Sequence, residues 1–273
     1  MFVLVVGHRG CRGVEPENTL VSFKKAIKFG VHAIELDVVV SGDYQIVVSH
    51  EPFMSQTYCL KPGGTELTSD EDKKYNLYQM SYQEIKQFDC GLKVHPRFVN
   101  QKKQTAYKPL LSEVIESCEV FTKNNSLSAI TYIIEIKSNS IYYDVFYPKP
   151  KEYVTLVLRT IAKYDFKDRI VLKSFDVAIL NEINKQQPEI KVSLLINRQE
   201  VISDKLKKLN FTPEILGAYY KLLNKEIVVK YQNLRFLIYA WTVNEMPDIE
   251  RIQSYGVDGI ITDYPNRFVE VLV

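Results

Sequence analysis

Short apolar runs rich in β-branched residues alternate along the chain with longer stretches of helical periodicity. Leu20, Phe23, Ala26 and Ile27 fall on one face of a first helix that we expect to begin near Pro16–Asn18. Eight runs have the composition of barrel strands: Phe2–Val6, Ala33–Val38, Tyr132–Ile136, Ile170–Lys173, Val192–Ile196, Ile215–Tyr219, Phe236–Trp241 and Gly259–Thr262. Alternating strands and helices indicate a parallel sheet, and eight strands close a TIM barrel. The pattern therefore predicts an α/β fold of the TIM (β/α)8 type.

Two segments depart from this rhythm. The link from the second strand to Ile46–Val48 is too short for a parallel crossover, so we expect a hairpin there. Residues from about 51 to 109 contain glycine, proline and charge clusters with little periodicity, and long insertions of this kind are usually functional or disordered. We expect an inserted lobe over the barrel mouth, with a helix around Ser81–Phe88. The whole chain, residues 1–273, is interpreted as one domain carrying this insertion.

Composition narrows the class of protein. The chain has 273 residues, of which 46% are apolar, and a formal net charge of +2, without the basic stripe of a nucleic-acid-binding protein. Its four cysteines show no C-x-x-C spacing, so we expect reduced thiols rather than a zinc site: Cys11, Cys59, Cys90 and Cys118. No transmembrane segment is expected, because no stretch approaches the roughly 18 apolar residues of a membrane span. The first apolar run is also too short for a signal peptide. These features favour the cytoplasm.

Three carboxylates are spaced so that they meet inside the barrel. Glu35 and Asp37 are two residues apart on one expected strand, and Glu135 and Lys137 are two apart on the next barrel strand. Residues at this spacing point to the same face of a strand. Carboxylates gathered without thiols fit one hard divalent cation, Mg²⁺ or Ca²⁺. The alternative is an ion-pair layer in which Lys137 faces Glu35 or Asp37, but the flanking histidines favour a metal site.

Two of the four histidines, His8 and His50, follow β-type runs directly. Either one alone could be a structural histidine, but the pair can divide the two proton transfers of phosphodiester cleavage. One imidazole takes the proton of the attacking hydroxyl and the other protonates the departing alkoxide. Arg9 is suited to a bidentate contact with phosphate oxygens. His32 and His95 lack such neighbours and are interpreted as structural or surface residues.

Motifs distributed over essentially the whole chain carry a resemblance to a known family. In order and spacing they resemble those of the glycerophosphodiester phosphodiesterases: His8-Arg9-Gly10, Pro16-Glu17-Asn18-Thr19, Glu35-Leu36-Asp37-Val38, Val48-Ser49-His50, Glu135-Ile136-Lys137, Leu172-Lys173-Ser174-Phe175-Asp176, Ala240-Trp241-Thr242-Val243-Asn244 and the segment from Gly256 to Pro265. The resemblance implies a TIM barrel, a divalent cation and hydrolysis of glycerophosphodiesters to glycerol 3-phosphate and an alcohol. The expected partner is therefore a small molecule, and the sequence carries no signal for an oligomeric state.

The same resemblance implies roles for individual residues. It assigns seven of them to the acid/base pair, the metal ligands and the phosphate-facing cations: His8 and His50; Glu35, Asp37 and Glu135; Arg9 and Lys137. Trp241, the only tryptophan, matches a wall against the glycerol portion of the substrate, and packing at the barrel top is an equal alternative. We expect Asn18 to act as an N-cap or as a loop hydrogen bond that braces the His8-Arg9 turn.

One position departs from the family pattern. The family usually has His-Asp at the second histidine, whereas this chain has His50-Glu51. We expect Glu51 to play a supporting role, by orienting the imidazole or bracing the loop.

Two other functions are weighed against hydrolysis of glycerophosphodiesters. Cleavage of lysolipids, as in phospholipase D or sphingomyelinase D enzymes that resemble this family, would call for an apolar path for the acyl chain. It would usually call also for a disulfide-braced catalytic loop, and Cys59 has no obvious close partner in the sequence. A barrel that binds phosphodiesters without turnover would be expected to lack a histidine or an acidic ligand. Every matched position is present, which disfavours that interpretation.

Overall fold

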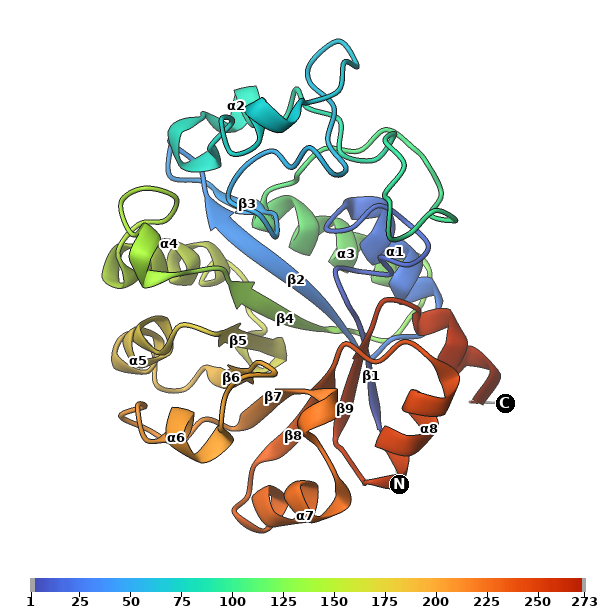
Figure 1. Cartoon of the computed structure of the whole chain (residues 1–273), viewed down its shortest axis with the longest axis vertical. Helices are drawn as coiled ribbons and strands as arrows, with labels where there is room; N and C mark the ends of the chain where they lie inside the picture. Colours follow the sequence, from blue (N-terminus) through green and yellow to red (C-terminus); the bar gives the residue numbers. More distant parts are fainter. Residues whose placement is uncertain (1–2, 272–273) are drawn as a thin grey trace.

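Eight parallel strands close into a barrel in the computed structural model, which describes residues 3–271 (Figure 1). The strands are β1 (Leu4–Gly7), β2 (Ala33–Val40), β4 (Thr131–Ile136), β5 (Ile170–Ser174), β6 (Lys191–Ile196), β7 (Ile215–Tyr219), β8 (Leu237–Trp241) and β9 (Gly259–Thr262). They follow one another around the barrel in chain order, and β1 closes the ring by pairing with both β2 and β9. The predicted TIM barrel is confirmed.

The strand bounds agree with the predicted ones to within two residues, and Phe2 lies outside the described part of the chain. The predicted hairpin is also present: β3 (Ile46–Val48) pairs antiparallel with β2, with Val38 opposite Val48. This short return matters for the site, because it brings Ser49, the residue after β3, beside Asp37, whose carbonyl accepts from the Ser49 amide at 3.0 Å.

Helices cover the outside of the barrel (Figure 1). They are α1 (Leu20–Lys28), α3 (Leu111–Asn124), α4 (Pro150–Ile161), α5 (Val177–Gln186), α6 (Ile202–Leu206), α7 (Lys225–Asn233) and α8 (Met246–Ser254). Helix α1 buries Phe23, Ala26 and Ile27, as its periodicity predicts. It begins two residues after the expected start, because Thr19 is the N-cap and its hydroxyl accepts a hydrogen bond from the amide of Ser22.

The barrel interior changes from apolar to charged along the strands. Before the level of the carboxylates along the strands, a small apolar cluster fills the interior: Val6, Ala33, Ile133, Val171, Ile215, Tyr239 and Ile261. A larger apolar core lies between the strands and the surrounding helices. Because alternate residues of a strand share a face, Glu35 and Asp37 project into the barrel as Ala33 does. They lie closer than Ala33 to the carboxyl ends of the strands. This is the end at which TIM barrels carry their active sites.

The insertion forms an irregular lobe at the rim of the barrel opening, on the side of β3, α1 and α3 (Figure 1). Its helix α2 (Tyr82–Ile85) is shorter than the predicted one. Ser81 begins it with a capping box, in which Ser81 Oγ accepts from the Glu84 amide and Glu84 accepts from the Ser81 amide. Among the helices within residues 3–271, none is long and apolar enough to serve as a membrane span.

The expectation of four reduced thiols is wrong for two of them. Cys59 and Cys90 form a disulfide, whereas Cys11 and Cys118 are free and buried. The two bonded residues are 31 positions apart in sequence, so their spacing does not reveal the pair. They meet because the residues beside them, Leu60 and Asp89, form an isolated antiparallel bridge within the insertion.

Candidate active site

Three buried carboxylates meet at the carboxyl ends of neighbouring strands. Glu35 and Asp37 come from β2, and Glu135 comes from β4, directly opposite Asp37 in the strand register. One oxygen of each lies within 4.8 Å of the others, a spacing that could hold a metal ion. A set of three carboxylate oxygens is the donor chemistry that Mg²⁺ and Ca²⁺ prefer. The residues that the sequence selected for the metal are therefore brought together.

Two lysines neutralise part of this negative charge. Lys137 Nζ lies 2.6 Å from Glu135 Oε1 and 3.8 Å from Asp37 Oδ1. Lys173, on β5, places its Nζ 2.7 Å from Glu35 Oε1 and 3.6 Å from Glu135 Oε2. Burial opposes the ionisation of Glu135, but the charges of Lys137 and Lys173 hold the pKa of this carboxyl below its ordinary value. An ion-pair layer, the alternative to a metal site, is thus present beside the carboxylate cluster, and it also includes Lys173.

His8 follows β1 and receives a carboxylate at its Nδ1. Asp263, which comes directly after β9, places Oδ1 2.6 Å from His8 Nδ1, and its other oxygen accepts a hydrogen bond from Asn244 Nδ2 at 2.7 Å. Burial would raise the pKa of Asp263, but His8, Arg12 and Asn244 hold it well below the ordinary range. An ionised partner at Nδ1 favours the tautomer whose Nε2 is free, and Nε2 lies 3.9 Å from Glu35 Oε2, beside the carboxylate cluster.

His50 lies two residues after the end of β3, and its imidazole also has a carboxylate at Nδ1. Its Nδ1 lies 2.7 Å from Glu51 Oε1, and the hydroxyl of Tyr58 donates to Glu51 Oε2 at 2.7 Å. Glu51 therefore contacts the imidazole at the nitrogen where a supporting acid is expected. Each of the two histidines consequently has Nδ1 occupied by a carboxylate, with Nε2 left for chemistry.

Arg9 lies in the turn after β1 and is held on several sides. The backbone at Arg9 has a φ of +50°, and Gly10 follows with a φ of +87°, a conformation that favours glycine. The Arg9 amide donates to Glu35 Oε2 at 3.0 Å, and its guanidinium lies 2.6 Å from Glu17 Oε1 and 3.2 Å from Asp37 Oδ2. The side chain of Asn18 donates to Asp37 Oδ2 at 2.9 Å, and the backbone amide of Asn18 donates to the carbonyl of Arg9. Asn18 thus braces the turn through loop hydrogen bonds, and it is not the N-cap of α1.

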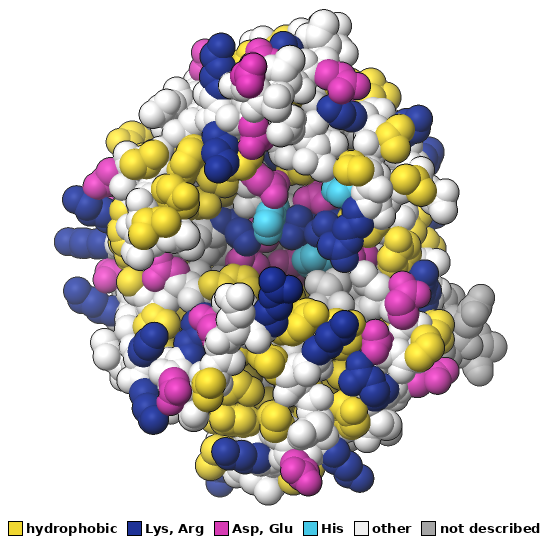
Figure 2. All heavy atoms as spheres, viewed as in Figure 1, with side chains coloured by type: hydrophobic (Ala, Val, Ile, Leu, Met, Phe, Trp, Pro, Cys, Tyr) yellow, Lys and Arg dark blue, Asp and Glu magenta, His cyan; other side chains and the backbone are white. Residues whose placement is uncertain are grey.

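A cavity of about 180 Å³ connects these groups. It opens at the centre of the face seen in Figure 2, where histidines and basic side chains surround acidic ones. Its lining includes both histidines, the cations Arg9, Arg12, Arg97, Lys137 and Lys173, Glu135, and an apolar side made of Phe175, Leu195, Trp241 and Ile261. A larger open groove of about 480 Å³ lies elsewhere, along α1 and α3, and contains none of the candidate residues.

Trp241 both lines the pocket and packs at the barrel top. Its ring forms part of the pocket wall and meets the Phe175 ring edge-on, with centroids 5.5 Å apart. Its indole Nε1 donates to the carbonyl of Gly217 at 2.8 Å, which fixes the ring at the barrel top.

The other two histidines lie outside the pocket lining. His32, directly before β2, accepts a hydrogen bond at its Nδ1 from the amide of Val5 in β1 at 3.0 Å, a contact typical of a structural residue. His95 is buried in the insertion, where it packs against the rings of Tyr58 and Phe98. Both therefore have the structural surroundings expected of them.

Comparisons with known proteins identify the family and the fold. Residues 8–267 match the model of the glycerophosphoryl diester phosphodiesterase family. A glycerophosphodiester phosphodiesterase from Caldanaerobacter subterraneus is 28% identical, with 100% of this chain and 98% of the relative covered. A Silicibacter pomeroyi structure assigned as a glycerophosphoryl diester phosphodiesterase has a TM-score of 0.87 at 31% identity, covering 99% of this chain and 94% of the other. An Oleispira antarctica phosphodiesterase, solved with its product sn-glycerol-3-phosphate, shares the fold at 22% identity, with a TM-score of 0.78 and coverage of 98% and 96%.

Proposed function

Because this chain belongs to the glycerophosphoryl diester phosphodiesterase family and is an enzyme that hydrolyses glycerophosphodiesters, we propose that His8 and His50 are its catalytic acid/base pair. The observation that carries this proposal is the convergence of two histidines, each with a carboxylate at Nδ1, on one cavity that also contains the carboxylate cluster. The products of this reaction are glycerol 3-phosphate and an alcohol.

Glu35, Asp37 and Glu135 would hold one divalent cation, Mg²⁺ or Ca²⁺, which when bound supplies positive charge against the phosphate and acidifies the attacking hydroxyl. The fit rests on three buried carboxylate oxygens that Lys137 and Lys173 neutralise only in part. Asp37 and Glu135 are ionised at neutral pH, because adjacent cations lower the pKa of each carboxyl despite its burial.

The remaining steps are carried by side chains of this chain. One of the two imidazoles accepts, at its Nε2, the proton of the attacking group, which is water or the substrate's own 2-hydroxyl, and the other donates a proton to the oxygen of the departing alcohol. Attack by the 2-hydroxyl forms a cyclic phosphate, which water then opens to glycerol 3-phosphate. Arg9 and Lys137 face the non-bridging phosphate oxygens, where their fixed charges stabilise the negative charge that builds up in the transition state. Trp241 and Phe175 form the apolar wall for the carbon atoms of the glycerol portion.

The test is release of glycerol 3-phosphate from glycerophosphocholine and glycerophosphoethanolamine. We expect EDTA to abolish the product and Mg²⁺ or Ca²⁺ to restore it. His8→Ala and His50→Ala should each lower kcat by roughly 10²–10⁴-fold with the fold retained, as judged by circular dichroism. His32→Gln is the matched control, since His32 lies outside the pocket lining and should leave kcat unchanged. A near-wild-type kcat in either alanine variant would refute the assignment of the pair.

Cleavage of lysolipids is the second candidate, and one observation favours it. The Cys59–Cys90 disulfide supplies the braced loop that the sequence did not reveal. The catalytic cavity favours a small diester instead, because it is small and most of its lining residues are polar or charged. Parallel assays on glycerophosphocholine and a lysophosphatidylcholine decide between the two, and a higher kcat/KM for the lysolipid would reverse the preference.

Metal-dependent binding of a glycerophosphodiester without product would support a binding protein.

The same disulfide bears on the compartment. Disulfides persist mainly in oxidising environments, so the Cys59–Cys90 pair weighs against the cytoplasm that the sequence favours. Determining the redox state of these two residues in the protein as isolated from its native cells, by alkylation and mass spectrometry, tests both expectations. Reduced thiols would support the cytoplasm, and the intact disulfide would support an oxidising compartment.

A further inference from the structure

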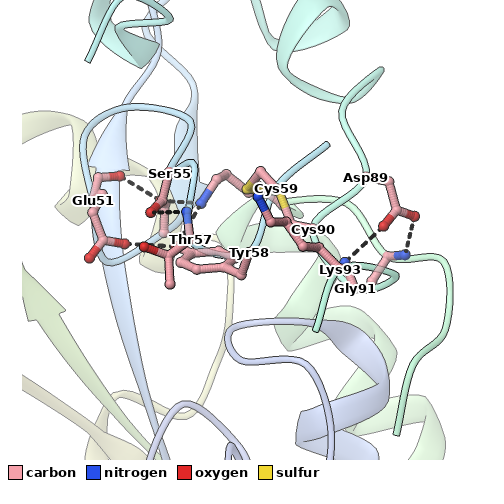
Figure 3. The surroundings of a disulfide bond; sticks show 12 residues. Glu51, Ser55, Thr57, Tyr58, Cys59, Asp89, Cys90, Gly91 and Lys93 are labelled. Atoms are coloured by element: carbon pink, nitrogen blue, oxygen red, sulfur yellow. Dashed lines mark hydrogen bonds between the residues drawn. A yellow bond between two sulfur atoms is a disulfide. The ribbon is translucent and has the colours of Figure 1, made fainter. Parts of the chain in front are cut away.

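The second histidine–carboxylate pair is supported by residues of the insertion rather than of the barrel. Glu51 Oε1 contacts His50 Nδ1 at 2.7 Å. The other oxygen of this carboxylate, Oε2, accepts from the Tyr58 hydroxyl at 2.7 Å (Figure 3). Lys108 Nζ contacts the same hydroxyl at 3.2 Å and donates to Ser49 Oγ at 2.8 Å. Both carboxylate oxygens of Glu51 are thereby held in place, although glutamate has one more rotatable bond than the aspartate usual at this position.

Burial fixes the direction in which the Tyr58 hydroxyl donates its hydrogen bond. Tyr58 and Lys108 are both buried, so neither can exchange its partner for bulk water. Burial acts to raise the pKa of Glu51, but its hydrogen bond to His50 and the charges of His50, Lys108 and Arg9 lower it. Burial lowers the pKa of Lys108 to about 8, against the charges of Glu51 and Glu17. A protonated Lys108 behind the Tyr58 hydroxyl directs that hydroxyl to donate toward the carboxylate of Glu51.

The Cys59–Cys90 disulfide joins the two segments that supply these residues. Tyr58 directly precedes Cys59 (Figure 3). Cys90 is tied to the other segment, because its amide donates to the carbonyl of Ala106 at 2.6 Å, two residues before Lys108. The carbonyl of Pro109, directly after Lys108, accepts from the amide of Val48 in β3 at 2.7 Å. The disulfide therefore lies at the junction of otherwise irregular chain segments that carry the support of His50.

We propose that Tyr58 and Lys108 are positioning residues for the reaction: held by the Cys59–Cys90 disulfide, they fix the Glu51 carboxylate against His50 Nδ1 and so orient the imidazole toward the substrate. The proposal rests on the catalytic role proposed above for His50. It adds a source of catalytic geometry outside the barrel, and it makes turnover depend on the redox state of the insertion.

Tyr58→Phe is the first test, because it removes one hydroxyl and keeps the ring that packs on His95. We expect kcat for glycerophosphocholine to fall about tenfold with KM within twofold of wild type, as for loss of one buried hydrogen bond to a charged group. Tyr82→Phe is the matched control. It removes a similar hydrogen bond, from a buried tyrosine of the insertion to Glu113 of α3 at 2.5 Å, and should leave kcat unchanged.

A double-mutant cycle separates positioning from a general structural role. If Tyr58 acts through Glu51, then Tyr58→Phe should change kcat less than twofold in a Glu51→Gln background. Lys108→Met should show the same dependence on Glu51. Full-sized losses from Tyr58→Phe or Lys108→Met in the Glu51→Gln background would overturn the proposal, even if every single variant is impaired.

Reduction tests the part played by the disulfide. Folded enzyme treated with a non-chelating phosphine should lose kcat to about the level of Tyr58→Phe, and the Tyr58→Phe variant should be insensitive to the reductant. The Cys11→Ser/Cys118→Ser variant, which lacks the two free thiols, is the control and should respond as wild type does. Unchanged kcat in reduced, folded wild-type enzyme would remove the disulfide from the proposal.

These outcomes are distinct from failure of the proposed function. If wild-type enzyme releases no glycerol 3-phosphate, or if His50→Ala retains kcat, the roles of the histidines fail first. If those controls behave as expected and the cycle between Tyr58 and Glu51 is additive, only the positioning proposal is refuted.

Discussion

Replacement of Asp263 by asparagine removes one charge from the pocket region with almost no change in volume. The two oxygens of Asp263 both accept hydrogen bonds, from His8 Nδ1 on one side and from Asn244 Nδ2 on the other. An asparagine side chain has only one acceptor oxygen and presents its NH₂ group on the other side. Asn244 cannot simply flip, because its own Oδ1 already accepts from the Asp263 amide and from Thr262 Oγ1. If that NH₂ group faces Asn244, two donors meet, and if it faces His8, the contact requires His8 Nδ1 to be unprotonated.

The magnitude follows from which contact is lost. If the new NH₂ group faces His8, it stabilises the tautomer with an unprotonated Nδ1, which places the proton on Nε2 and blocks that nitrogen as a base. Loss of a buried hydrogen bond between His8 and a charged partner is worth about 1.5–3 kcal/mol, or about 10- to 150-fold in rate. We expect Asp263→Asn to lower kcat by this factor, with a smaller effect on KM because the substrate contacts remain.

The assay is release of glycerol 3-phosphate from glycerophosphocholine at saturating divalent cation. Asp258→Asn is the control, since Asp258 also accepts two hydrogen bonds, from Gln232 Nε2 and the amide of Ile238, but lies before β9 instead of after it. It should lower stability and leave kcat per folded molecule unchanged. A kcat for Asp263→Asn within threefold of wild type would refute the reasoning about the tautomer.

Three further predictions concern the metal, acid stability and packing. Glu135→Gln should raise the cation concentration needed for half-maximal activity at least about tenfold, measured by titration after chelation, and an unchanged midpoint would contradict its role as a ligand. The pKa values of Glu17, Asp37 and Asp263 are lowered in the folded state, so their stabilising contribution is complete above about pH 5, where the unfolded carboxyls are also ionised, and is lost as the pH falls through their folded pKa values. Urea unfolding should therefore show stability falling steadily below about pH 5, and a flat profile would count against these shifts. Phe23→Ala, at a fully buried position on α1, should cost about 3–5 kcal/mol in urea unfolding without changing kcat per folded molecule.

The barrel could be predicted from the sequence because its pattern is local. Each strand is a short apolar run, and the spacing of two between Glu35 and Asp37 is enough to place both on the interior face beyond Ala33. The same parity rule would have placed Lys173 inside the barrel, two residues after Val171, and closure of the ring would have brought it near the carboxylates. Asp263 follows the last strand as His8 follows the first, so its position also signals a residue of the site. The positions of both residues can therefore be predicted from the pattern of the strands.

Tyr58 and Lys108 have no such signal, because the insertion has no period from which a direction can be inferred. Their meeting depends on the bridge between Leu60 and Asp89, which is not encoded by any short motif, and on a disulfide across 31 residues. The barrel and the insertion thus contribute to the two histidines in different ways. His8 depends on Asp263, a residue fixed by a neighbouring barrel strand, whereas Glu51 at His50 depends on contacts made within an irregular lobe. Disturbance of the insertion should therefore affect the second histidine before the first, and the double-mutant cycle at Glu51 measures that asymmetry directly.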